Sequence, residues 1–75
     1  MDEAKPTYGQ ELVRVKFNPN KDHMVYVLKM AFADLIDRHN DAAYTESDGE
    51  KVRLHKVAIT EIEGACMRSV KAFTE

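Results

Sequence analysis

Residues 17–29, FNPNKDHMVYVLK, place an aromatic side chain and a proline turn directly before an apolar helical segment. Pro19 has no backbone N–H donor and keeps the preceding Asn18 extended, so regular structure breaks at this point. Asn20 or Asp22 can cap a helix that follows, because the oxygen of either side chain accepts from free N–H groups in the first turn. The stretch therefore predicts that a helix begins after residue 20 or 22.

Apolar residues then recur at helical spacing, which predicts an amphipathic helix that ends near Asn40. They are Val25, Leu28, Phe32, Leu35 and Ile36. Upstream, residues 12–17 (LVRVKF) alternate between apolar and basic side chains, with the period of an extended segment. We expect residues 1–11, which are polar and contain Pro6 and Gly9, to form a loose tail.

A second helix is predicted from Lys51 to about Phe73, a run without proline. Ser47 and Glu50 are three residues apart and predict a capping box at its start. One stripe of this helix is built from small and apolar residues, namely Leu54, Ala58, Ile62 and Ala65. The stripe and its neighbours are too wide for the first helix to cover alone.

The predicted fold is therefore all-α: a single domain over residues 1–75, built as an antiparallel two-helix hairpin with an extended N-terminal arm. A core of this size supplies only about 3–5 kcal/mol of stability. Cys66 is the single cysteine, so no disulfide can add to it. We expect the hairpin to assemble as a homo-oligomer.

The net charge of −2 is unevenly distributed. Residues 12–33 carry +3, residues 34–50 carry −5 and residues 51–75 carry +2. This pattern argues against a uniform basic face for DNA or RNA, but a small anion needs only a few placed cations. No signal peptide or long apolar run is present, and a lone thiol suits a reducing compartment, so we expect a cytoplasmic protein without membrane contact.

Catalytic and metal-binding patterns are weak in this sequence. The three histidines, at positions 23, 39 and 55, lack the four-residue spacing of a helical metal pair, so we expect neither a metal nor another cofactor. Cys66 lies among apolar neighbours, as a buried structural thiol does. Asp34, Asp37 and Asp41 share one helix face, which we interpret as a solvated surface. No nucleophile–base set is evident, and we expect a protein that is not an enzyme.

The opening stretch nevertheless holds the parts of a nucleotide pocket. Phe17 can stack on a base, and Asn18 can hydrogen-bond a base edge. The helix N-terminus suits a phosphate, and Lys29 adds a mobile cation on the same face as Tyr26. The same residues also fit a capped helix in which Phe17 and Tyr26 are core and Lys29 is solvated.

Three segments together resemble a known family. They are RVKFNPN, then VYVLKMAFADLID, and after an acidic turn AITEIEGACMRSVKAFT. Their order is similar to that of the small phage anti-CBASS proteins that sequester cyclic oligonucleotides, and a similar helical hairpin occurs in phage Thoeris anti-defence sponges. The resemblance covers residues 13–74, and residues 58–67 of the second helix are its most specific part.

The resemblance implies a non-enzymatic protein that holds cyclic di- or trinucleotide immune signals, such as 3′,3′-cGAMP, away from their effectors. It implies a homo-oligomer, typically a hexamer, with pockets where two protomers meet. The stacking aromatic then corresponds to Phe17, the turn to Asn18 and Pro19, and the basic residue at the phosphate to Lys29. Three alternatives remain: a helical module that docks on a host or phage protein, a nucleic-acid-binding accessory protein, and an enzyme that degrades the signal.

Overall fold

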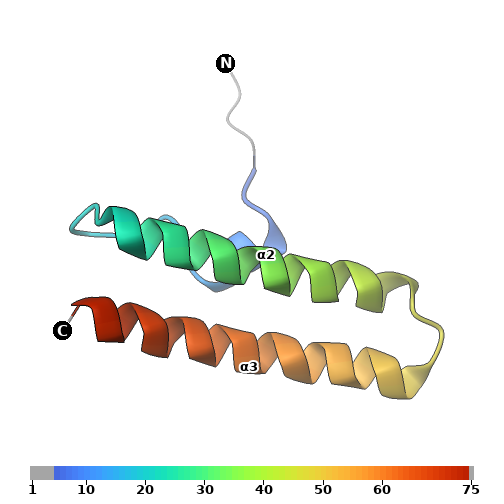
Figure 1. The fold of residues 1–75 in the computed structure, drawn as a ribbon. Coiled ribbons are helices and arrows are strands. Elements are labelled where there is room, and N and C mark those ends of the chain that lie inside the picture. The colour runs from blue at the N-terminus through green and yellow to red at the C-terminus, as the bar shows by residue number, and fades with distance from the viewer. Residues whose placement is uncertain (1–4, 75) are drawn as a thin grey trace.

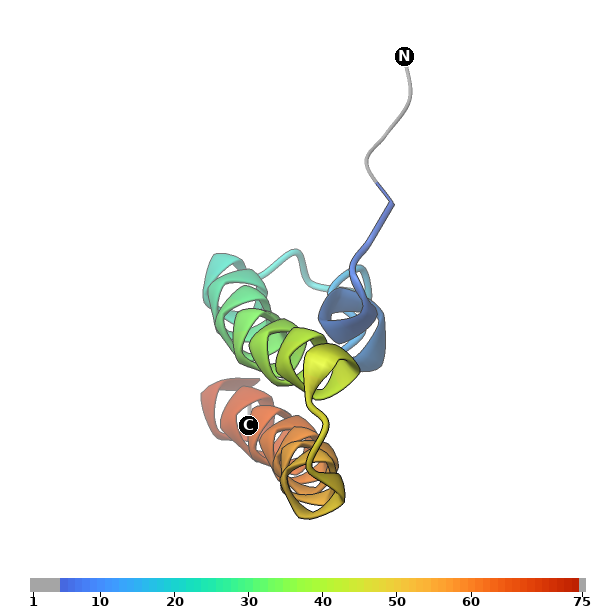
Figure 2. The ribbon, with the colours of Figure 1, turned by 90° about the vertical axis from the view of Figure 1, so that its right-hand side faces the viewer.

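The computed structural model describes residues 5–74, which contain three helices and no strand. They are α1 (Tyr8–Leu12), α2 (His23–Thr45) and α3 (Gly49–Thr74). The long helices α2 and α3 lie side by side and run in opposite directions (Figure 1). Viewed from the end, α1 packs beside α2, which therefore contacts both other helices (Figure 2). The prediction of an all-helical protein is confirmed.

Helix α2 begins where the proline turn predicts. Asp22 is its N-cap, and the Asp22 carboxylate accepts from the backbone N–H groups of Met24 at 2.8 Å and Val25 at 3.3 Å. The helix ends at Thr45, five residues after the predicted end near Asn40. Alanines 42 and 43 are strong helix formers, and no proline or glycine interrupts the segment before Gly49, so the helix continues.

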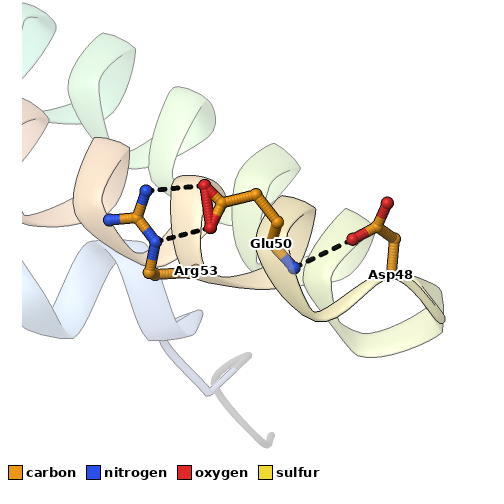
Figure 3. A network of polar contacts seen from close by, with 3 residues as sticks. All are labelled: Asp48, Glu50 and Arg53. Atoms are coloured by element: carbon orange, nitrogen blue, oxygen red, sulfur yellow. Dashed lines mark hydrogen bonds and ion pairs between the residues drawn. The ribbon is translucent and has the colours of Figure 1, made fainter.

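Helix α3 starts at Gly49 with a different cap from the one predicted. The Asp48 carboxylate accepts from the Glu50 N–H at 2.9 Å, while the Glu50 carboxylate accepts from the Arg53 guanidinium at 2.7 and 2.8 Å (Figure 3). The Ser47–Glu50 capping box is therefore wrong, because Glu50 pairs with Arg53. This hydrogen bond lowers the pKa of Glu50. The helix ends at Thr74, one residue beyond the prediction.

The predicted extended arm is wrong. Residues 8–12 form α1, whose N-cap Thr7 makes a reciprocal capping box with Gln10. Residues 13–16 continue as turns, in which the Val15 N–H donates to the Gln10 carbonyl at 3.0 Å. The loose-tail prediction fails for residues 8–11, and its first four residues lie outside the described part of the chain.

The core lies between α2 and α3, and the chain after α1 closes one side of it. Ile36 is fully buried at its centre, and the buried cluster comprises Val13, Ala33, Ile36, Ile59 and Cys66. Burial raises the pKa of the Cys66 thiol, while the Lys29 charge acts in the opposite direction. The buried thiol was expected from the sequence. No helix within residues 5–74 is long and apolar enough to span a membrane.

Two polar contacts fix the helices to one another. The Gly9 N–H donates to the Asp37 carboxylate at 2.7 Å, which ties α1 to α2. Asp37 is therefore half-buried and bonded, which corrects the interpretation of it as part of a solvated row. Near the turn between α2 and α3, the Nδ1 atoms of His39 and His55 lie 2.9 Å apart.

Gly9 has no room for a side chain. A Cβ atom there would lie 2.3 Å from the Ala33 carbonyl oxygen and 2.9 Å from the Asp37 carboxylate. We expect Gly9→Ala to lower the free energy of unfolding by about 1–3 kcal/mol, because α1 must move off α2. Urea denaturation followed by circular dichroism measures the change.

Gly64→Ala is the matched control for this substitution. Its Cβ would meet only the Arg68 guanidinium, at 3.5 Å, so the variant should gain roughly 0.5–1 kcal/mol from better helix propensity. A Gly9→Ala protein as stable as the wild type would contradict the close contact.

Candidate functional site

The most unusual group in the structure is the ammonium of Lys29 in the middle of α2. The residue is only 7% exposed, and its Nζ donates to the carbonyl oxygens of Phe17 at 2.5 Å and Arg14 at 3.0 Å. Within residues 5–74 no carboxylate lies within 4 Å of this Nζ. A buried cation normally has an anionic partner, so an unpaired one marks a candidate site for an anion.

Two adjoining cavities meet at Lys29. The larger has a volume of about 400 Å³ and lies between the chain after α1 and helix α3; Arg14, Glu63, Cys66 and Met67 contribute to its walls. The smaller, of about 220 Å³, is lined by the turn at residues 17–20 and by the end of α3. Lys29 and Val70 line both. Ligand pockets typically have volumes of about 300–1,000 Å³, so the pair is large enough for a small molecule.

Phe17 forms part of the rim of the smaller cavity. The residue is 64% exposed, although its side chain is large and apolar, and the ring centroid lies 5.5 Å from the Lys29 Nζ. The alternative in which Phe17 belongs to the core is therefore wrong. A cation at this distance from an aromatic ring is attracted to it. The contact orients the ring, and the exposed surface remains available for stacking.

The turn residues have a different role from the one expected. The Asn18 amide donates to the Asp22 carbonyl at 2.8 Å and accepts from the Asp22 N–H at 3.0 Å. Both ends of the amide therefore close the turn, which leaves it poorly placed to read a base edge. Pro19 lines the smaller cavity beside Asn18.

The N-terminus of α2 is unsuited to a phosphate, which corrects the sequence-based interpretation. The Asp22 carboxylate accepts from the Met24 and Val25 N–H groups, and its negative charge would repel a phosphate at the same place. Any anion site on this part of the chain must depend on side-chain cations.

Tyr26 lines neither of the two cavities that meet at Lys29. It is half-exposed and lines another hollow with Lys16 and Lys21. This hollow shares Asn18 with the smaller cavity. The structure thus brings together four of the five predicted site residues, Phe17, Asn18, Pro19 and Lys29, and leaves Tyr26 outside. Lys29 is also held in place and is not the mobile cation that the sequence suggests.

Sequence reasoning missed Arg14, which lines the larger cavity with Lys29. Arg14 belongs to the segment that was predicted to be extended, and no motif distinguishes it. No cluster of three or more metal-binding side chains occurs among the described residues. Comparisons with protein-family models, with curated proteins and with solved structures found no match to this chain.

Replacing Lys29 by methionine should release the segment after α1. The variant keeps the length of the side chain but removes both bonds to carbonyls, each of which contributes about 1.5–3 kcal/mol when the donor is charged. We expect amide hydrogen exchange at Val15 and Phe17 to accelerate at least about tenfold. Both amides are hydrogen-bonded within this segment in the wild type.

Lys56→Met provides the comparison, because Lys56 is an exposed lysine on α3. It should leave the exchange rates of Val15 and Phe17 unchanged. If Lys29→Met also leaves them unchanged, the ammonium does not hold this segment in place.

Proposed function

We propose that the protein binds cyclic oligonucleotide second messengers in the cavities beside Lys29 and sequesters them without turnover. The observation that supports this most directly is the exposed Phe17 ring next to a buried and unpaired ammonium. An aromatic platform and a cation at this spacing suit a base and its neighbouring phosphate. The resemblance to anti-CBASS sponges points to the same ligands, with 3′,3′-cGAMP as the first to test.

In this proposal the chain acts in the cytoplasm of a bacterial host and blocks CBASS-type signalling. Sequestration requires only tight equilibrium binding and enough copies of the protein, so no catalytic residues are needed. The site also includes Asn18 and Pro19, whose role is to hold Phe17 at the edge of the smaller cavity. Tyr26 is not part of the proposed site.

The proposed assembly is a homo-oligomer, with a hexamer as the form that the resemblance implies. Several large apolar side chains of a small protein are exposed, including Met24, Val27 and Leu35 on α2. These three are three and eight residues apart and so share one side of the helix. Leu35 is two residues from Ala33, which contacts α1, so this side faces away from α1.

The same exposed side chains favour a second candidate function, a homo-oligomeric module that binds a host or phage protein. A module of that kind would assemble without a nucleotide and would retain none. The two candidates are therefore separated by whether the purified protein takes up a cyclic nucleotide.

Titration calorimetry with 3′,3′-cGAMP tests the ligand and the role of Phe17. We expect Phe17→Ala to weaken binding by about 1–3 kcal/mol, which is roughly fivefold to more than a hundredfold in Kd. Heating the complex should release the nucleotide chemically intact, since an enzyme would release a product.

Tyr44→Ala is the control, because Tyr44 is an aromatic residue that is 92% exposed at the far end of α2. The Tyr44→Ala variant should bind 3′,3′-cGAMP with the affinity of the wild type. Equal affinity of both variants would remove Phe17 from the site, and absence of any binding would favour the interaction module.

Light scattering coupled to size-exclusion chromatography tests the assembly. Leu35→Glu places a charge on the exposed side of α2 and should convert the oligomer to monomers with unchanged helix content. Tyr44→Glu, nine residues further on and so on the opposite side of the helix, should leave the mass unchanged. A wild-type protein that elutes as a monomer would overturn the proposed assembly.

A further inference from the structure

Arg14 has a backbone conformation that its side chain disfavours. Its φ is 55°, in the left-handed region that glycine occupies far more readily than other residues. The conformation closes α1, because the Arg14 N–H donates to the Glu11 carbonyl at 3.1 Å and the Val15 N–H donates to the Gln10 carbonyl at 3.0 Å, as in a helix C-terminal motif. Among the residues that the structure describes, the other non-glycine residue with positive φ is Lys21, at 51°.

Lys29 contacts the main chain of Arg14. The Arg14 carbonyl accepts from the Lys29 Nζ at 3.0 Å and from the Phe17 N–H at 2.8 Å. Both bonds are made to the carbonyl oxygen and hold the main chain of Arg14 in place. The side chain itself is exposed, and its guanidinium has no hydrogen bond or ion pair with any described residue.

Lys29 and Arg14 differ in how many of their side-chain N–H donors are already hydrogen-bonded. An ammonium has three N–H donors, and Lys29 has committed two of them to carbonyl groups. A guanidinium has five donors in a planar fork that matches two oxygens of a phosphate, and those of Arg14 are all unused. Both cations line the larger cavity, where Glu63 of α3 is the acidic residue in its wall.

We infer that Arg14 is the main phosphate contact of the larger cavity and that Lys29 is a positioning residue, which sets Arg14 through its main chain. The ligand class is a phosphate group carried by a nucleotide, held at the side of the cavity away from Glu63. This inference rests on the proposed function and deepens it. It assigns to Arg14 the contact that the sequence assigned to Lys29.

The test compares Arg14→Gly with Lys21→Gly. Each substitution removes one positive charge and relieves one positive φ, since glycine adopts this conformation without steric cost. Only Arg14 lines the cavity with Lys29, because Lys21 lines the hollow beside Tyr26. We expect neither variant to have a lower Tm than the wild type, so a loss of binding cannot be attributed to unfolding.

Two ligands are titrated into each protein, 3′,3′-cGAMP and inorganic pyrophosphate. We expect Arg14→Gly to raise the Kd of the cyclic dinucleotide about tenfold or more, as the loss of a charged hydrogen bond does. Lys21→Gly should change it less than about twofold, as is usual for a charge outside a site. Arg14→Lys keeps the charge but loses the planar set of donors, so its Kd for the cyclic dinucleotide should lie between those of the wild type and Arg14→Gly.

The outcomes separate this inference from the function on which it rests. If the wild type binds the cyclic dinucleotide and Arg14→Gly binds it equally well, the role of Arg14 is overturned and the function stands. If only pyrophosphate binds, and Arg14→Gly abolishes that binding, the phosphate site stands and the cyclic-nucleotide function is overturned. Equal losses in both glycine variants would indicate general charge attraction and overturn the inference. Absence of binding by the wild type to either ligand would overturn both proposals.

Discussion

The pair of hydrogen bonds from the Lys29 ammonium to the Arg14 and Phe17 carbonyls determines the shape of one side of this molecule. The segment between α1 and α2 contains no regular structure, and these two bonds attach it to the middle of α2. Both cavities are lined by Lys29, and the Phe17 side chain is exposed at the rim of the smaller one. One buried cation thus organises both the backbone and the electrostatics of the candidate site.

The sequence predicts the long helices well because each depends on local signals. The Asp22 cap and the apolar periodicity locate α2, and the proline-free run locates α3. The segment at residues 12–17 was predicted to be extended because apolar and basic side chains alternate along it. The alternation does match the burial, since Val13 and Val15 are less exposed than the basic residues beside them. Its backbone is turned because α1 packs on α2 at Gly9, a contact between residues 24 positions apart that no local pattern reveals.

Most residues of the candidate site could be predicted from the sequence, but the contacts that they make could not. Phe17, Asn18, Pro19 and Lys29 do meet, since the proline turn returns the chain to the helix. The sequence could not show that the Asn18 amide closes that turn, that Asp22 blocks the helix N-terminus, or that Lys29 is buried. Arg14 was missed because its position depends on the conformation of the segment that was predicted incorrectly.

The contact between His39 and His55 has a consequence for the two identical side chains. With their Nδ1 atoms 2.9 Å apart, one ring must donate a proton and the other must accept it, so the two imidazoles hold different tautomers. The contact therefore gives two residues of the same type opposite polarity at the outer ring nitrogen, with an acceptor Nε2 on the ring that donates and a donor Nε2–H on the ring that accepts.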